Sequence, residues 1–262
     1  MARRTHPLLV AFAALVFAFL VGPLVIIVGA ALSDTSFLTF PPQGLTLHWF
    51  FNAFEISAFR RTMVTSFTLA TFGTALSLLV GIPAAYALHR YRVELPAFLS
   101  TVFVLPILVP EIVLGFSLMK SVTTAMGWPI YATLLVGHAL LVLPYCVRVV
   151  GASLAAFDFS VEEAAVSLGC PRWRAFFTVV LPNVRAGVIA AFILAFITSL
   201  NDVSLSLFLT GPGISTLPIQ LLAHMEQFFD PTIAAVSVML MLVTVAVMAA
   251  LEWTLGLTFL TK

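Results

Sequence analysis

Two groups of ionisable residues in this sequence have types and positions that could do chemistry. Glu111 follows Pro110 within one long apolar stretch, and Asp202 follows Asn201 within another. A carboxylate at membrane depth costs about 2.5–3.5 kcal/mol, so each needs a compensating role. Two roles stay open for each of them. The carboxylate lines a polar path and favours a cationic solute, or it pairs with a neighbouring chain or a backbone donor.

The second group lies in a polar segment, residues 151–183, between two apolar stretches. Ser160 and Glu163 have the spacing of a capping box, which predicts a helix that starts near Val161. Gly169 is expected to end it in the left-handed conformation, with Pro171 just beyond. A second short helix is expected around residues 172–179, and Pro182 marks the start of the next apolar stretch.

This segment has the composition of a docking element. Ala164, Ala165 and Gly169 leave one face almost bare, so that another surface can approach closely. Its charges stand at the ends of the predicted helix: Glu162, Glu163, Arg172 and Arg174. Composition alone leaves two interpretations, a helix docked in the groove of a partner protein and an amphipathic helix resting on the bilayer.

The sequence lacks the motifs of catalysis and nucleotide binding. It has no phosphate-binding loop, no Gly-x-Ser-x-Gly elbow, no His-Glu-x-x-His zinc pair and no Gly-x-Gly-x-x-Gly turn. Cys146 and Cys170 do not have metal-site spacing, and for His138 we expect a hydrogen-bonded packing role. We therefore expect no enzyme activity, no metal and no cofactor in this chain.

The composition is that of a membrane protein. Of 262 residues, 61% are hydrophobic and only 9% are charged, whereas soluble domains carry roughly 25% charged residues. This excludes a cytosolic enzyme, a nucleic-acid binder and a disordered regulator. The formal net charge of +1 gives no strong field toward a polyanionic partner, so we expect no nucleic acid.

The apolar stretches predict an all-α, polytopic fold that forms a single transmembrane domain, residues 1–262. A spanning helix needs about 20 mostly apolar residues, and six segments qualify: about 8–32, 62–88, 96–119, 130–150, 184–209 and 232–251. The first is too long for a signal-peptide core, so we expect it to be retained. A short interfacial helix is expected near residues 49–57, where Trp49, Phe50, Ala53, Phe54 and Ser57 share one face.

The distribution of Lys and Arg predicts that both termini are cytoplasmic. With the N-terminus inside, nine of the twelve basic residues are cytoplasmic, and only Arg60, Arg61 and Lys120 are outside. The segment 151–183 then lies on the cytoplasmic side.

The sequence of the segment 151–183 resembles the signature of a known protein family. It is similar to the EAA signature of the permeases of ATP-binding cassette (ABC) importers. The matching residues are Glu163-Ala164-Ala165, then Gly169 after three residues, Val179 after nine more, and Leu181-Pro182 after one more. The only departure is Val179 where the signature has Ile. Pro106 to Gly115, Leu200 to Val203, Thr216 to Pro218 and Asp230-Pro231 resemble the polyamine-type branch, in particular the second permease of spermidine/putrescine importers.

The resemblance implies a type I ABC-importer transmembrane domain in a bacterial inner membrane. The implied partners are an ATPase dimer that binds ATP and Mg, a second permease and an extracytoplasmic solute-binding protein, all at the lipid bilayer. The coupling residues would be Glu163, Ala164, Ala165, Gly169, Arg172, Leu181 and Pro182. The translocation path would include Asp202, Glu111 and Asn201, and the solute would be a polyamine or a related cation.

Two alternatives remain. An importer of the same architecture could carry another solute, such as ferric iron, thiamine, an organophosphonate or an opine. An ion-coupled secondary transporter could use Glu111 and Asp202 as ion sites, but the halves show no obvious repeat and the cytoplasmic segment would have no role. An integral membrane enzyme is the weakest option.

Overall fold

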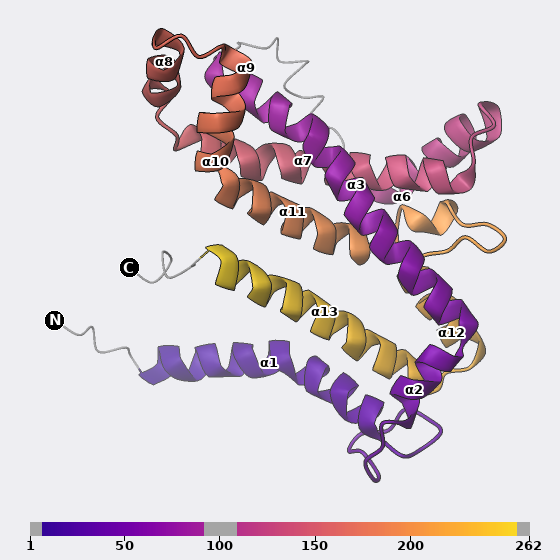
Figure 1. Cartoon of the computed structure of the whole chain (residues 1–262). Coiled ribbons are helices and arrows are strands. Elements are labelled where there is room, and N and C mark those ends of the chain that lie inside the picture. Colours follow the sequence, from indigo (N-terminus) through magenta and orange to yellow (C-terminus); the bar gives the residue numbers. More distant parts are fainter. Residues whose placement is uncertain (1–6, 92–108, 256–262) are drawn as a thin grey trace. The chain divides into compact units, whose positions relative to one another are not determined.

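A computed structural model describes residues 7–91 and 109–255 of the chain as a succession of helices (Figure 1). Within these ranges no β-strand occurs, and a single bridge pairs Gly211 with Ile214. The predicted all-α class is confirmed for the described residues. The chain divides into two compact units, residues 1–60 with 220–245 and residues 61–219 with 246–262.

The first unit contains α1 (Pro7–Leu32), α2 (His48–Glu55), the end of α12 (Leu217–Gln227) and most of α13 (Thr232–Leu255). Its core is made of small apolar residues: Ala30, Ala31, Ala234, Ala235 and Val238. The helix α2 confirms the expected short helix, and its Trp49 Nε1 donates a 2.8 Å hydrogen bond to Ser33 O. Ser57, which was expected on the same face, already belongs to α3.

The second unit is built around three long helices, α3 (Ser57–Arg90), α7 (Ile130–Ala155) and α11 (Arg185–Leu200). Glycines allow α3 to lie directly against α7. A Cβ atom at Gly73 would be 3.2 Å from the Cβ of His138, and one at Gly81 would be 3.1 Å from that of Cys146. Such close approach of backbones is typical of helices that associate inside membranes.

A further helix, α6 (Glu111–Leu118), continues into a π-helix, η1 (Met119–Ala125). The predicted third span, 96–119, therefore lies partly outside the described residues. α6 packs tightly on the chain that follows α11, because a Cβ atom at Gly115 would lie 2.5 Å from Leu205 O. This contact fixes Glu111, the first residue of α6, near the segment after α11.

The predicted fifth span, 184–209, is wrong at its C-terminal end. α11 ends at Leu200, and residues 201–209 form an irregular segment with one 3₁₀ turn, η3 (Ser206–Phe208). The physical reason is Asp202, whose carboxylate accepts the backbone N–H groups of Leu205 and Ser206. Short polar side chains of this kind compete with the helical hydrogen bonds of the backbone.

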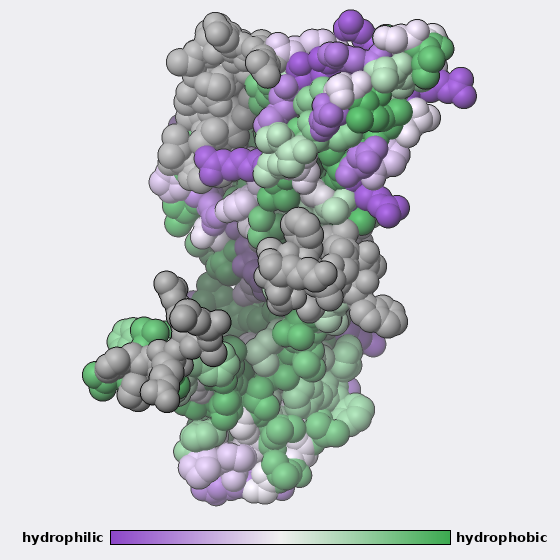
Figure 2. All heavy atoms as spheres, turned by 90° about the vertical axis from the view of Figure 1, so that its left-hand side faces the viewer, coloured by the Kyte–Doolittle hydropathy of each residue, from purple (hydrophilic) through white to green (hydrophobic). Residues whose placement is uncertain are grey.

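Four described helices are long and apolar enough to cross a membrane: α1, α3, α7 and α13. A fifth span is possible if residues 172–183 and α11, which meet at an angle of 72°, cross as one bent element. Figure 2 shows hydrophobic side chains spread over the first unit, and hydrophilic ones gathered at the end of the second unit that carries α8 (Ser160–Ser167) and α9 (Arg172–Ala175). Much of this apolar surface is exposed on α1, as expected for a lipid-facing or partner-facing helix.

The segment between α7 and α11 is helical along most of its length. After α8 and α9 it continues through a π-helical turn, η2 (Phe176–Val180), into α10 (Leu181–Asn183). The predicted two-turn helix and the predicted second helix both exist, but the second reaches Asn183 rather than residue 179.

Candidate functional site

The start of α8 is fixed by Asp158 rather than by the predicted capping box. The helix begins at Ser160, and Ser160 makes no capping bond with Glu163. Instead, the N–H of Ser160 donates to Asp158 Oδ1 at 3.0 Å, and its hydroxyl donates to Oδ2 at 2.8 Å. These two bonds hold the pKa of the Asp158 carboxyl below its usual value. The capping-box prediction was wrong because the N–H and the hydroxyl of Ser160 both donate to Asp158, two residues earlier.

The end of α8 agrees with the sequence. Gly169 has a φ of +91°, the left-handed conformation that was predicted for it. The N–H of Gly169 donates to Val166 O at 2.9 Å, and the N–H of Cys170 donates to Ala165 O at 3.1 Å. This pair of bonds is the Schellman arrangement, which stops the helix and turns the chain toward α9.

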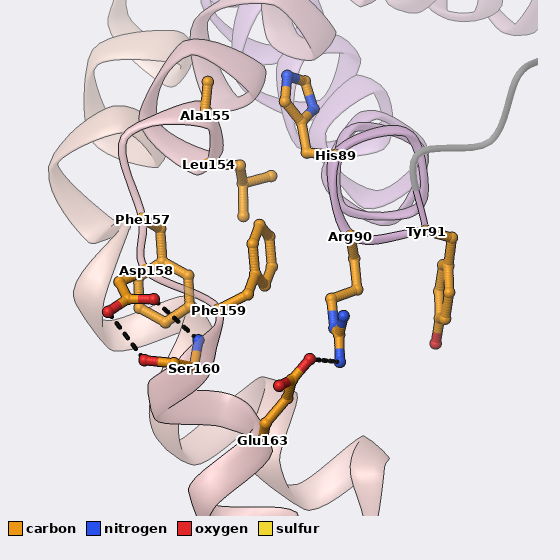
Figure 3. A pocket seen from close by; sticks show the side chains of 10 residues that line it. All are labelled: His89, Arg90, Tyr91, Leu154, Ala155, Phe157, Asp158, Phe159, Ser160 and Glu163. Atoms are coloured by element: carbon orange, nitrogen blue, oxygen red, sulfur yellow. Dashed lines mark hydrogen bonds and ion pairs between the residues drawn. The ribbon is translucent and has the colours of Figure 1, made fainter.

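The two adjacent glutamates of α8 have different environments. Glu162 is 1% exposed, whereas the side chain of Glu163 is 62% exposed. Both lie next to Arg90, the last residue of α3, whose Nη2 donates a 3.1 Å hydrogen bond to Glu163 Oε1 (Figure 3). Arg90 Nε also lies 2.9 Å from Glu162 Oε2, an ion pair in which the N–H is not aligned for a hydrogen bond.

Aromatic residues lie around the partners of the buried carboxylate. The Tyr86 hydroxyl donates a 2.5 Å hydrogen bond to Glu162 Oε1. The Tyr86 ring packs edge-on against Phe176, with 4.8 Å between centroids, and the Arg90 guanidinium lies 5.5 Å from the centroid of Phe159. The end of α3 and the start of α8 are therefore joined by a charged contact with apolar walls. Beside it lies a cavity of about 660 Å³ (Figure 3).

The outer face of the segment is open. Leu168 is 90% exposed and Trp173 is 69% exposed. Of the seven residues to which the resemblance assigns coupling, Glu163, Ala164, Gly169, Arg172 and Pro182 are exposed, and Ala165 and Leu181 are half-buried. The structure thus brings the EAA residues to one accessible end of the second unit.

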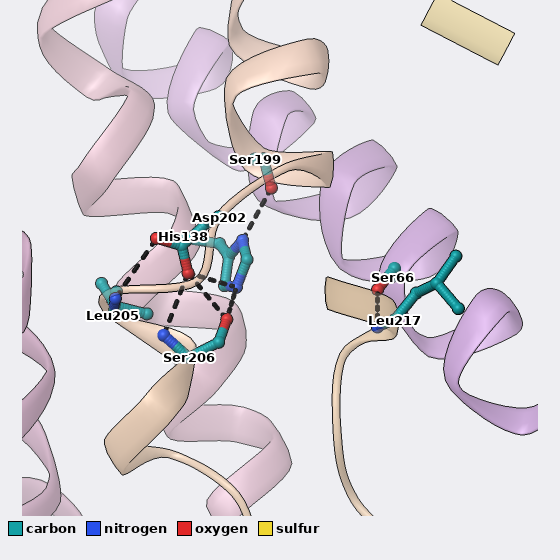
Figure 4. A network of polar contacts seen from close by, with 7 residues as sticks. All are labelled: Ser66, His138, Ser199, Asp202, Leu205, Ser206 and Leu217. Carbon is teal, nitrogen blue, oxygen red and sulfur yellow. Dashed lines mark hydrogen bonds and ion pairs between the residues drawn. The ribbon is translucent and has the colours of Figure 1, made fainter. Parts of the chain in front are cut away.

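A second polar cluster surrounds His138, and Figure 4 shows its contacts. His138 Nδ1 lies 2.7 Å from Ser199 Oγ, and its Nε2 lies 3.2 Å from Ser206 Oγ. The expected hydrogen-bonded packing role of His138 is confirmed.

Asp202 belongs to the same cluster. It is buried, its Oδ1 accepts the N–H of Leu205 at 3.2 Å, and its Oδ2 accepts the N–H and the hydroxyl of Ser206 at 2.9 and 2.7 Å. Its Oδ2 is also 3.9 Å from His138 Nε2. These contacts favour the structural alternative that the sequence left open for Asp202.

Glu111 and Asn201 have weaker ties to this cluster. Glu111 is half-buried at the start of α6, and Ser204 and Asp202 are its polar neighbours. Asn201 is exposed, and its amide donates to Ile197 O of its own helix at 2.9 Å. The structure therefore brings Glu111 and Asp202 together, with Asn201 beside them in the chain and bonded to α11.

Sequence reasoning missed Glu162, Arg90 and Tyr86 as partners. A usable signal was present, because Glu162 lies three residues after Phe159 and four before Val166, on one helical face with them. A glutamate on an apolar face predicts a buried partner. Only the fold shows that this partner comes from the end of α3.

Known proteins resemble this chain in sequence and in fold. The putrescine permease PotI and the spermidine/putrescine permease PotC, both of Escherichia coli K12, are each 27% identical to it. The matches cover 90% and 91% of this chain, and 86% and 90% of PotI and PotC respectively. The putative 2-aminoethylphosphonate permease PhnV of Salmonella paratyphi A is 28% identical, over 91% of this chain and 89% of PhnV.

The fold is also that of solved transporters. A bacterial ABC transporter involved in the import of the acidic polysaccharide alginate matches with a TM-score of 0.70 at 16% identity. This match covers 96% of this chain and 98% of that one. The MetNI methionine ABC transporter matches with a TM-score of 0.61 at 19% identity, over 75% of this chain and 92% of that one.

The family model of binding-protein-dependent transport system inner membrane components matches residues 77–254. That range contains α8, the coupling residues suggested by the EAA resemblance and the His138 cluster. The protein therefore belongs to this family of multi-pass inner-membrane permeases, and it is a transport subunit of an ABC importer rather than an enzyme.

Proposed function

We propose that this chain forms part of the translocation path of an ATP-driven importer for a polyamine or a related cationic solute. The solute class is supported by PotI and PotC, which are named for putrescine and spermidine and which match along most of their length. The similarity to PhnV supports a second candidate, an organophosphonate such as 2-aminoethylphosphonate. Both candidate solutes carry an amine, so a carboxylate in the path is compatible with either.

The complex in which the chain works would contain three other components: a second permease, an ATPase dimer that binds ATP and Mg, and an extracytoplasmic solute-binding protein. The family description names a dependence on a binding protein. A second structure of the alginate transporter is of a complex with a periplasmic protein, and its permease fold matches this chain with a TM-score of 0.67. Energy would come from the ATPase dimer.

The observation that carries this proposal is the exposed end of the second unit, where α8 presents Glu163 and Leu168 to a partner. We infer that α8 docks in a groove of the ATPase subunit, and that closure of the ATPases on ATP pushes the segment 151–183. A conformational change of this kind needs contacts that differ between two states, and a protruding helix held by its own chain can supply them.

We further propose six spanning helices with both termini in the cytoplasm. The positive-inside distribution supports this orientation, and the long helices α1, α3, α7 and α13 match four of the six predicted spans. Single cysteines introduced into a chain without Cys146 and Cys170 test it. A membrane-impermeant thiol reagent added outside should label position 45 in intact cells and should not label position 168.

Within the path, we propose that Glu111 faces the solute together with Asn201 and that Asp202 supports the two. Glu111 is half-buried, whereas both Asp202 oxygens are engaged by backbone and hydroxyl donors. A partly solvated carboxylate is the better candidate to attract a cation.

The complete complex in proteoliposomes tests the function. We expect putrescine loaded on the binding protein to enter the liposomes only when ATP is present on the side of the membrane that carries the ATPase subunits. We expect an imposed proton or sodium gradient to drive no uptake. Uptake of 2-aminoethylphosphonate without putrescine uptake would assign the second solute. Gradient-driven uptake by the chain alone would contradict the importer.

A further inference from the structure

The contact between α3 and α8 has features that surface ion pairs lack. Glu162 is almost completely buried, and Arg90 and Tyr86 approach its two oxygens separately, at 2.9 and 2.5 Å. A buried carboxylate is stable only where charge and hydrogen bonds replace its water. Both replacements come from one helix, α3, and within five residues of its end.

The geometry points to a specific role for this contact. We propose that Glu162, Arg90 and Tyr86 form a brace that fixes α8 to the spanning helix α3, so that force applied to α8 by an ATPase is passed to α3. The proposal rests on the proposed function. It assigns Glu162, which is not the glutamate of the EAA signature, as a positioning residue for coupling.

Arg90 gives the brace a direct link to the outer face. Its guanidinium bonds Glu163 through Nη2 and pairs with Glu162 through Nε. A planar guanidinium carries several N–H groups and can lie against two carboxylates at once through different nitrogens, which the single ammonium nitrogen of a lysine cannot do. If a partner displaces the exposed Glu163, Arg90 therefore moves with it and changes its contact with the buried carboxylate of Glu162.

The surroundings make the brace stiff. The rings of Phe159 and Phe176 pack against Tyr86, and the Arg90 guanidinium lies over the ring of Phe159. An ion pair with apolar walls is weakly screened, so its geometry is held more firmly than that of an exposed pair. By contrast, Leu168 and Gly169, which follow the last residue of α8, are exposed.

The test compares matched variants of the complete complex, with permeases, ATPase and binding protein, in proteoliposomes. Putrescine uptake and phosphate release are measured together, per assembled complex. E162Q keeps the size of the side chain and removes its charge. We expect it to lower putrescine transported per ATP about fivefold or more, while the ATPase subunit still co-purifies.

Three further variants test the same contact if the E162Q complex does not assemble. Y86F removes only one hydroxyl and should lower the ratio less than E162Q, in the same direction. Y91F removes a hydroxyl from an exposed ring at the same helix end and should leave the ratio unchanged. R90K keeps the charge and should lower the ratio, because it cannot hold both carboxylates.

The outcomes separate the brace from the proposed function. A normal ratio in E162Q, Y86F and R90K, with ATP-driven uptake intact, would overturn the brace and leave the importer standing. A lower yield or melting temperature with a normal ratio would show that the contact only stabilises the fold, which also overturns it. No ATP-driven uptake by the unmodified complex would overturn the proposed function and the brace together.

Discussion

Ser206 Oγ donates a 2.7 Å hydrogen bond to Asp202 Oδ2, and the same hydroxyl lies 3.2 Å from His138 Nε2. One serine thus joins a buried carboxylate to a buried imidazole. The cluster also ends α11, because Asp202 accepts the backbone N–H groups of the two residues that open the following turn. A role in folding and a role in transport therefore make different predictions here.

The first prediction concerns Asp202. In D202N one oxygen becomes an NH₂ group, which cannot accept the bonds from Ser206, so buried donors lose their partner at a cost of about 1–3 kcal/mol. We expect a lower melting temperature of the detergent-purified complex and an unchanged KM for solute uptake per folded complex. S206A should lower the melting temperature in the same direction. An unchanged melting temperature with a raised KM would instead place Asp202 directly on the path.

The second prediction concerns Glu111. E111Q keeps the size of the side chain and removes its charge, so the fold should be little affected. We expect the KM for putrescine to rise about tenfold if the carboxylate attracts the cation, which corresponds to about 1.4 kcal/mol. Uptake kinetics measured beside D202N provide the comparison. Identical kinetics of E111Q and the unmodified complex would remove Glu111 from the path.

The third prediction concerns close packing of α6. G115A places a Cβ atom 2.5 Å from the carbonyl oxygen of Leu205, where backbone rather than a flexible side chain must move. Overpacking of this kind costs about 1–3 kcal/mol, so the melting temperature should fall. G22A is the matched control, because a Cβ atom at Gly22 in α1 would meet nothing within 4 Å. Equal stability of G115A and the unmodified complex would contradict the packing of α6 on residue 205.

The position of the helices could be predicted well from the sequence because apolar runs of more than 20 residues leave few alternatives. The segments predicted at 62–88, 130–150 and 232–251 are covered by α3, α7 and α13, which differ from them by at most five residues at either end. The end of α11 could not be predicted in this way. Asn201 and Asp202 were assigned to the helix because apolar residues continue after them, whereas a local hydrogen-bond pattern decided its end.

The site was predictable in its outline and not in its internal contacts. The left-handed conformation of Gly169 and a helix of about two turns before it follow from local signals and are found in the structure, whereas the capping box expected at the start of α8 is not. The difference between Glu162 and Glu163 depends on α3, whose last turn lies about seventy residues earlier in the chain. The residues around Glu162 and Glu163 in the sequence do not indicate that Arg90, far away in the chain, lies beside both carboxylates.

The fourth prediction tests the outer face of α8. Leu168 is 90% exposed, and a leucine there suits a groove on a partner protein. L168D should reduce co-purification of the ATPase subunit and ATP-driven uptake, while the permease still inserts into the membrane. L45D is the control, since Leu45 is 78% exposed in the first unit and is predicted to lie on the opposite side of the membrane. If α8 only rested on lipid, L168D would leave co-purification unchanged.

The fifth prediction uses two glycines with the same backbone conformation. Gly169 and Gly127 have φ values of +91° and +73°, and a Cβ atom at either would meet nothing within 4 Å. An alanine in this region costs about 1–2 kcal/mol from backbone strain alone, so G169A and G127A should lose similar stability. Only G169A changes the turn that follows α8, at the bare surface where a partner would approach. We therefore expect G169A to lower ATP-driven uptake more than G127A when both are normalised to assembled permease, and equal losses would mean that backbone strain, rather than docking at α8, accounts for the effect.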